Sequence, residues 1–161
     1  MKAMAPFDTT PRTHRRAMTA EEIRRLLAAC EPHRRLLLET AFVTGLRVNE
    51  LRHLELHHLD LKRLGLRLDA KWTKNRKPGF QPLPASLASR LHGSAATGEA
   101  GQLYAKRRRE DSTLRIPRNP LLYVPSSMAR YLDKDLLAAG IPKHAPGGKL
   151  DFHAIRLAYI N

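Results

Sequence analysis

The apolar residues of the first fifty positions recur every three or four residues, which is the period of a helix that buries one face. Thr19 followed closely by two glutamates is typical of a helix N-terminus, because its side-chain oxygen can accept a hydrogen bond from an exposed amide. We therefore predict a helix over 20–30. Pro32 suits the first position of a second helix that ends at Gly45, and a third, short helix follows in the region 48–54.

The period then changes from that of a helix to that of a strand. Apolar and polar side chains alternate over 66–72, which predicts a half-buried strand. Pro78 and Gly79 form a turn signal, so 80–83 is expected to return as the partner strand. A short strand around 59–62 would precede both.

The rest of the pattern is again mainly helical. From residue 84 onward we predict, in order, a helix over 84–92, a loop over 93–101, a basic helical segment over 103–110, a buried strand over 121–124, a helix over 128–139 and a final segment over 151–161. The predicted fold class is therefore α+β, mainly α-helical with a small antiparallel β-sheet.

The charge of the chain points to a polyanionic partner. Its 161 residues include 29 Lys and Arg against 15 Asp and Glu, a formal net charge of +14. An excess this large repels itself in the compact state unless something anionic shares the surface. Double-stranded DNA is the expected partner, because neutralising its phosphates releases condensed counterions. A basic surface that meets only solvent is the alternative.

The sequence does not indicate a disulfide-rich, secreted, membrane-spanning or metal-binding protein. The single cysteine, Cys30, excludes an intrachain disulfide framework and fits a cytoplasmic, DNA-associated setting. Residues 1–16 lack the apolar stretch of a secretory signal, and no apolar run is long enough to span a bilayer, so no membrane is expected as a partner. His53 and His57 have the spacing of two metal ligands, but no third ligand follows at a telling distance, so neither a metal nor a cofactor is expected.

Three segments place polar side chains where each could meet a phosphate. Arg47 follows a tight turn and begins a helix, so its guanidinium lies near exposed helix amides, a setting suited to a phosphate oxygen. Lys74 lies at the tip of the predicted hairpin, where it can reach over a groove. His153 and Arg156 are three residues apart and therefore share one face of a helix.

These segments together resemble the motifs of the tyrosine recombinases, also called phage integrases. Thr-Gly-Leu-Arg-Val-Asn-Glu-Leu at 44–51 is similar to the first box of that family. Trp-Thr-Lys-Asn at 72–75, followed by Pro-Leu-Pro at 82–84, is similar to its lysine hairpin. Asp-Phe-His-Ala-Ile-Arg at 151–156 is similar to its second box, and the order and separation of the three agree. With an opening that also looks like the family's, the resemblance covers about 18–161 and implies the family's DNA breaking-rejoining catalytic fold.

The resemblance implies site-specific DNA recombination or integration, as in mobile elements, by a reaction without metal or cofactor. In the family a tyrosine attacks the scissile phosphate and forms a 3′-phosphotyrosyl link. Arg47 and Arg156 match the arginines that stabilise the transition state, Lys74 the general acid and His153 the histidine that handles protons or binds the phosphate. Glu50 matches an acidic residue that supports the first arginine.

Some of these roles have alternatives on the sequence alone. A shift of the alignment by one step along the hairpin would transfer the role of Lys74 to Lys77. His153 could instead be a structural histidine, and the basic run of 106–109 could be a solvated helix face. Further DNA contacts are expected from the remaining basic residues of the hairpin and of that run, namely Lys71, Arg76, Lys77, Lys106, Arg107, Arg108 and Arg109.

The pattern of the family continues beyond what this sequence contains. Family members have a third motif and then the nucleophilic tyrosine, whereas this sequence ends at Asn161. Tyr159 lies one helical turn beyond Arg156, and attack on a phosphate held by an arginine of its own helix would need an awkward geometry. We therefore expect a partial catalytic domain over 18–161, preceded by a basic flexible tail over 1–17. It would lack the nucleophile.

The expected activity of this chain follows from that truncation. It should bind DNA but be inactive by itself, while the complete protein should act as a homo-oligomer on DNA. Two other functions remain open. One is a non-catalytic DNA-binding regulator built on a recombinase scaffold, and the other is a fragment similar to the type IB topoisomerases, although the wording of the first box favours the integrases.

Overall fold

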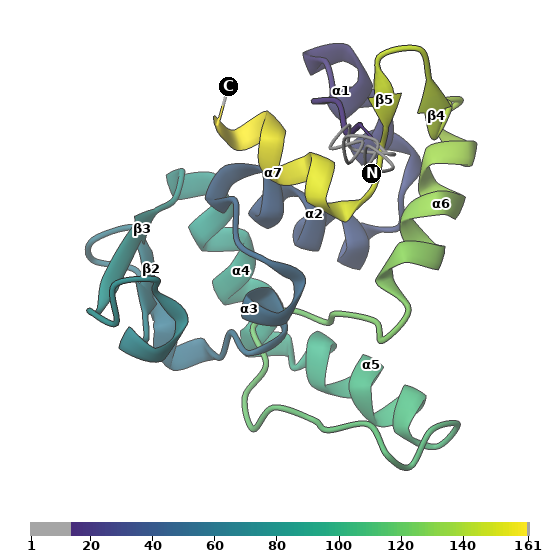
Figure 1. Ribbon diagram of the computed structural model, residues 1–161. Coiled ribbons are helices and arrows are strands. Elements are labelled where there is room, and N and C mark those ends of the chain that lie inside the picture. Colours follow the sequence, from purple (N-terminus) through teal and green to yellow (C-terminus); the bar gives the residue numbers. More distant parts are fainter. Residues whose placement is uncertain (1–13, 161) are drawn as a thin grey trace, which may run out of the picture.

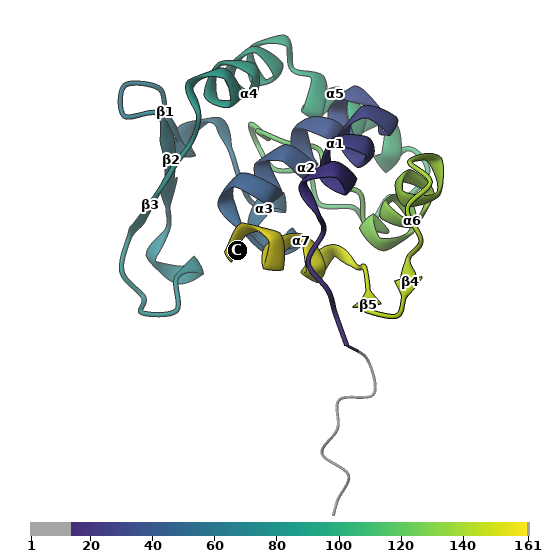
Figure 2. The same ribbon diagram turned by 90° about the horizontal axis from the view of Figure 1, so that it is seen from above.

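The helix α2 (Pro32–Thr44) forms the centre of the molecule, and three other helices pack around it. The computed structural model describes the backbone of residues 14–160 and the side chains of 14–158. Helices α1 (Ala20–Ala29), α4 (Ala85–Thr97) and α7 (Phe152–Ile160) all contact α2 (Figures 1 and 2). The predicted second helix is confirmed with both of its ends, because Pro32 begins it and Gly45 follows its last residue.

The first helix begins with the cap that the sequence predicts. The Thr19 hydroxyl accepts a hydrogen bond of 3.2 Å from the amide of Glu22, and the Glu22 carboxylate accepts one of 2.9 Å from the amide of Thr19. Arg16 also donates two bonds of 2.8 Å to that carboxylate. These bonds from Arg16 are the main reason that the pKa of Glu22 is lowered to about 2.

The small sheet has the antiparallel order β1-β2-β3, with β1 (Leu59–Asp60), β2 (Gly65–Leu68) and β3 (Gly79–Pro82). It stands beside the helices, at the left of Figure 1. Gly65 is required at the start of β2, because a Cβ atom there would lie 2.3 Å from the ring of Phe80 and 2.6 Å from the carbonyl oxygen of Gln81.

The predicted strand over 66–72 is only half right. The strand ends at Leu68, and the short helix η2 (Ala70–Trp72) replaces its second half. The Trp72 ring lies against the buried His58 ring, with their centroids 4.8 Å apart. His58 belongs to the short helix η1 (Leu56–His58) just ahead of the sheet. Packing against this ring thus decides the position of Trp72, which alternation alone had placed in the sheet.

The predicted loop over 93–101 is wrong. Helix α4 continues to Thr97, Gly98 adopts a left-handed conformation with φ of 70°, and α5 (Glu99–Arg108) begins at once. The small residues of this segment resemble loop residues by composition, but alanine and serine are tolerated in helices. The single residue Gly98 therefore makes the turn that the sequence analysis spread over nine positions.

The segment 121–124 is buried as predicted, but it is not a strand. Leu121, Leu122 and Val124 are almost fully buried in an irregular connection, and just ahead of them Pro120 forms an isolated bridge to Glu55. Helix α6 (Met128–Ala138) follows, and Gly140 ends its last turn with φ of 66°. A two-stranded ribbon of β4 (His144–Ala145) and β5 (Gly148–Lys149), which the sequence analysis did not predict, leads into α7.

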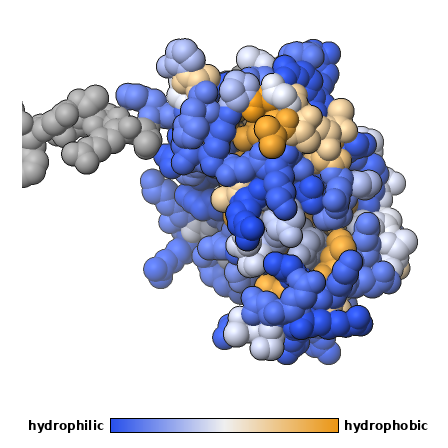
Figure 3. All heavy atoms as spheres, turned by 90° about the vertical axis from the view of Figure 1, so that its right-hand side faces the viewer, coloured by the Kyte–Doolittle hydropathy of each residue, from blue (hydrophilic) through white to orange (hydrophobic). Residues whose placement is uncertain are grey.

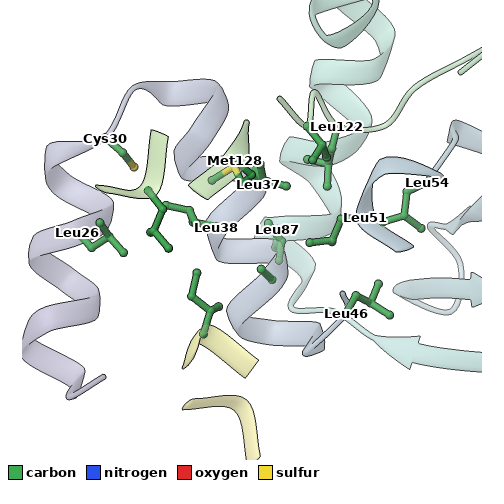
Figure 4. Close-up of a cluster of buried hydrophobic side chains, with 14 of the residues drawn as sticks. Leu26, Cys30, Leu37, Leu38, Leu46, Leu51, Leu54, Leu87, Leu122 and Met128 are labelled. Atoms are coloured by element: carbon green, nitrogen blue, oxygen red, sulfur yellow. The ribbon is translucent and has the colours of Figure 1, made fainter. Parts of the chain in front are cut away.

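The hydrophobic core lies where the helices meet and consists mainly of leucines. Leu26 from α1 and Leu37 and Leu38 from α2 are completely buried, and residues of α4 and α6 close the cluster (Figure 4). Leu51 extends it to the short helix α3 (Val48–Arg52) that follows α2. Among the described residues, no helix is both long and apolar enough to cross a membrane.

Candidate DNA-binding and catalytic site

Three of the four predicted catalytic residues line one hollow on the surface. An open depression of about 260 Å³ lies between the start of α3 and the first turns of α7. Its walls are formed by Arg47, Val48, Asn49, Phe152, His153 and Arg156. The fold thus brings the first and second boxes of the sequence, which are far apart in the chain, to a single place. We call this depression the catalytic hollow.

Arg47 is held at the rim of the catalytic hollow by Glu50. The carboxylate of Glu50 accepts a hydrogen bond of 2.6 Å from the Arg47 amide and one of 3.0 Å from the Arg47 guanidinium. The side chain of Glu50 is 14% exposed, whereas that of Arg47 is 64% exposed. A largely buried carboxylate therefore fixes both ends of a residue whose remaining guanidinium donors face solvent, which suits an anionic ligand.

Arg156 is fixed from the other side by the backbone of the first box. Its Nε donates a hydrogen bond of 2.7 Å to the carbonyl oxygen of Gly45. Gly45 has a φ of 64°, the left-handed conformation that ends α2. Because Nε is used for this contact, the two terminal nitrogens of Arg156 remain for a ligand in the hollow.

His153 lies on the exposed face of the first turn of α7, beside Arg156 in the wall of the hollow. The start of this turn is held by Asp151, whose carboxylate accepts a hydrogen bond of 3.1 Å from the amide of Ala154. Asp151 also accepts one of 2.8 Å from Arg15, and Arg15 pairs with Lys149 in an isolated bridge. Residues 14–17 were assigned to the tail by the sequence analysis, and residues 14–16 of it lie against the segment that leads into α7. Residues 1–13 of that tail lie outside the described part of the chain.

Lys74 does not line the catalytic hollow. It is exposed in the turn between η2 and β3, together with Asn75, Arg76 and Lys77. The Thr73 hydroxyl lies 2.5 Å from the carbonyl oxygen of Lys77, and the Asn75 side chain accepts a bond of 3.2 Å from the Lys77 amide. We call residues 73–77 the lysine turn. It projects toward the same side of the molecule as α7, the lower side in Figure 2.

A cluster of aromatic rings packs next to the lysine turn. The His58 ring is 3% exposed and lies between the rings of Trp72 and His57, with centroid distances of 4.8 and 3.9 Å. Its Nδ1 accepts a hydrogen bond of 2.9 Å from the amide of Glu55. Burial is the main cause that lowers the pKa of His58, and the neighbouring His57 lowers it further. His58 belongs to no sequence motif, and a lone histidine in a sequence carries no signal of burial.

The other predicted DNA-binding residues fall into two separate groups. Arg76 and Lys77 belong to the lysine turn and Lys71 lies just ahead of it, and all three are exposed but do not line the catalytic hollow. The run at Lys106–Arg109 lies at the end of α5, on the far side of α2 from α7 (Figure 2). The fold therefore does not bring this second group to the catalytic hollow.

The tyrosines whose side chains are described are engaged elsewhere. Tyr104 is fully buried, and its hydroxyl accepts a bond of 3.1 Å from the amide of Val124. The Tyr123 ring meets the Tyr104 ring edge to face, and the Arg34 guanidinium lies 5.1 Å from the centre of the Tyr131 ring. None of these three lines the catalytic hollow. The side chain of Tyr159, on which the sequence analysis commented, lies outside the described residues.

Comparisons with known proteins identify the family and the fold of the chain. The sequence model of the phage integrase family matches residues 16–157. A comparison of the sequence with curated proteins gave no match.

The similar solved structures include XerA recombinase, with a TM-score of 0.59, 18% identity and 94% of this chain covered. The catalytic domain of bacteriophage HP1 integrase has a TM-score of 0.54 at 19% identity over 91% of this chain, and the integrase from mycobacterium phage Brujita has 0.58 at 18% over 92%. The chain spans 50%, 70% and 44% of the length of these three structures, respectively. It has their mainly helical fold with small antiparallel sheets, and it belongs to the phage integrase family.

Proposed function

We propose that this chain contains the phosphate-binding part of a tyrosine recombinase, which recombines or integrates DNA through a 3′-phosphotyrosyl intermediate. The observation that carries the proposal is the catalytic hollow. There Arg156 contacts the backbone of Gly45, which lies 111 residues away in the sequence, and the guanidiniums of Arg47 and Arg156 line the same walls as His153. Two guanidiniums and an imidazole around one open depression are suited to a phosphodiester.

The reaction requires charge stabilisation more than it requires new functional groups. A tyrosine oxygen bonds to phosphorus while the bond to the 5′-oxygen breaks, and negative charge grows on the two nonbridging oxygens. Arg47 and Arg156 would stabilise this charge, and each is already oriented, by Glu50 and by the carbonyl of Gly45. Donors that are fixed before the reaction stabilise a transition state without reorganising during it.

Proton transfer is assigned to His153 and Lys74. His153 would accept the proton of the attacking hydroxyl or hydrogen-bond a nonbridging oxygen. Lys74 would donate a proton to the departing 5′-oxygen from the lysine turn. Trp72, just ahead of that turn, packs against the buried His58, whereas Lys74 itself is exposed. We therefore propose that bound DNA brings the Lys74 ammonium against the leaving group.

DNA binding is tested first, with a matched control for charge. Replacement of Arg47 or Arg156 by alanine should weaken binding to a duplex and lower the slope of log K against log salt by about 0.9 for each lost phosphate contact. Arg90→Ala removes the same charge from α4, where Arg90 pairs with Glu39. If all three variants bound DNA equally well, the assignment of the catalytic hollow would be wrong.

Cleavage is tested with a nicked suicide substrate, on which a covalent protein–DNA adduct would accumulate. We propose that these 161 residues bind DNA but form no adduct, because Tyr104, Tyr123 and Tyr131 are engaged away from the catalytic hollow. An adduct that disappears with Tyr159→Phe would show that the nucleophile is present in this chain.

A further inference from the structure

A second group of basic side chains surrounds a pocket between α5 and α6, away from the catalytic hollow. The pocket has a volume of about 230 Å³ and is lined by Arg107, Ser127, Arg130, Tyr131 and Lys134. It shares no residue with the catalytic hollow. Helix α6 lies at the right of Figure 1, and the end of α5 approaches its N-terminal end from below. We call this the α5–α6 pocket.

Two of its three cations have no carboxylate partner in the described part of the chain. The two acidic residues of α6 are engaged elsewhere, since Asp133 accepts from Lys143 and Asp135 from Arg34. Arg107 pairs with Glu110, but no ion pair involves Arg130 or Lys134 within residues 14–158. These two like charges are four residues apart on one helix face, a spacing at which they repel each other.

The pocket also contains unused hydrogen-bond donors. Ser127 precedes α6 as its N-cap, yet its side chain makes no capping hydrogen bond. The first amides of a helix point out of its end and carry partial positive charge. The guanidinium of Arg34 and the ammonium of Lys134 lie 5.1 and 5.5 Å from the centre of the Tyr131 ring. Cations and a hydroxyl therefore line one space, and the first amides of α6 follow Ser127 directly.

The surface around the pocket fits an anion better than an apolar ligand. Figure 3 looks onto the side of the molecule that carries α6, and most of its lower half, toward the end of α5, is hydrophilic. We propose that the α5–α6 pocket binds a phosphate group, held by Arg130 and Lys134 with the Ser127 hydroxyl at its base. Its source is either a backbone phosphate of DNA, which rests on the proposed function, or free phosphate, which does not.

The test uses the 161-residue chain and inorganic phosphate as the probe, with amide chemical shifts followed by NMR. Phosphate should perturb the amides of the first turn of α6 in a saturable manner. In the double variant Arg130→Ala/Lys134→Ala, the Kd for phosphate should rise about tenfold or more, as expected for the loss of charge-assisted hydrogen bonds. The matched control is Arg115→Ala/Arg118→Ala, which removes two exposed arginines that line neither the pocket nor the hollow.

Two results would overturn the proposal. One is the absence of saturable shifts at the start of α6, and the other is an equal rise in Kd in the control variant, which would indicate only the loss of net charge. Circular dichroism of each variant verifies that α6 remains folded, and Arg130→Lys, which keeps the charge, should retain most of the affinity.

A duplex titration distinguishes the two sources of phosphate. If the pocket holds a DNA phosphate, duplex should displace inorganic phosphate from α6, and the double variant should bind DNA more weakly than the control. If the pocket holds free phosphate, duplex should leave these amide shifts unchanged. Failure of the proposed function would look different, because loss of all DNA binding would leave the response of α6 to inorganic phosphate intact.

Discussion

Arg156 donates a hydrogen bond from Nε to the carbonyl oxygen of Gly45, two positions before Arg47. The two arginines of the catalytic hollow are therefore joined through the end of α2. Whatever displaces the backbone at Gly45 should displace both guanidiniums together. Gly45 adopts a φ of 64°, where a Cβ atom is unfavourable.

Gly45→Ala should therefore weaken DNA binding without removing any charged group. Forcing alanine into the left-handed conformation costs about 1–2 kcal/mol, which urea denaturation will measure. Gly98→Ala is the matched control, since Gly98 has a φ of 70° at the end of α4 and open space around its Cβ position. Both variants should lose similar stability, and only Gly45→Ala should lose affinity for DNA. Equal affinities of the two variants for DNA would show that the turn at Gly45 does not position the arginines of the catalytic hollow.

Glu50→Ala separates positioning from net charge. Removal of an acidic residue beside a DNA site raises the net charge and by itself favours binding. Glu50 also holds the guanidinium and the amide of Arg47, so its loss should free that side chain. We expect a duplex Kd several-fold higher than that of the unchanged protein, on the order of 1 kcal/mol for one lost hydrogen bond. Glu21→Ala, on the exposed first turn of α1, is the control. If Glu50→Ala bound the duplex more tightly, the change in net charge alone would explain the result, and the proposed positioning role of Glu50 would be wrong.

The pair of Arg34 and Asp135 should be the most sensitive polar contact of the fold. The Arg34 guanidinium donates two hydrogen bonds, of 2.7 and 2.9 Å, to the Asp135 carboxylate, and both residues are more than nine-tenths buried. Asp135→Ala leaves the buried Arg34 guanidinium with only the exposed Glu31 carboxylate, at 3.5 Å, and should lower the free energy of unfolding by about 3–5 kcal/mol. Asp133→Ala, which breaks the exposed pair with Lys143, should cost about 0–1 kcal/mol. Similar losses in both variants would refute this account.

Mild acid should destabilise the protein through its buried histidines. Burial lowers the pKa of His58 and of His33 below the ordinary value of 6.5. The unfolded chain therefore takes up protons as the pH falls through about 6.5, whereas the folded chain takes them up only at lower pH. Stability should be fully present above that pH and should decline between pH 7 and 5.

The histidine effect is measured by thermal unfolding at several pH values. His58→Gln should show a flatter decline of Tm between pH 7 and 5, whereas His92→Gln, on an exposed face of α4, should keep the full slope. An unchanged slope in His58→Gln would mean that other groups cause the dependence.

The sequence predicts most helices because their signals are local. Thr19 and Gly45 mark helix ends by chemistry that needs no partner elsewhere in the chain, and both are where the pattern places them. Two of the errors lie where residues outside the segment decide its structure. Trp72 leaves the strand to pack on His58. The irregular segment at 121–124 is buried, but the bridge to Glu55 is made by Pro120 beside it.

The candidate site divides in the same way. Box motifs identify Arg47, His153 and Arg156, and the fold brings these three together. The contacts that hold these side chains could be predicted only in part. Arg156 contacts the carbonyl oxygen of Gly45, a backbone atom that no sequence motif specifies. Arg130 and Lys134 were missed because an ordinary amphipathic helix also exposes basic residues at this spacing.

The contact between residues 14–16 and the start of α7 has a practical consequence. The His14 carbonyl accepts a bond of 2.7 Å from the Lys149 amide, and Arg15 reaches Asp151 at 2.8 Å. A tag or fluorophore attached just ahead of His14 would thus lie close to Asp151, which is two positions before His153. A fluorophore at that position should report the binding of DNA. An affinity tag that must not disturb DNA binding should instead be attached on the opposite side of the molecule, for example on the exposed face of α4.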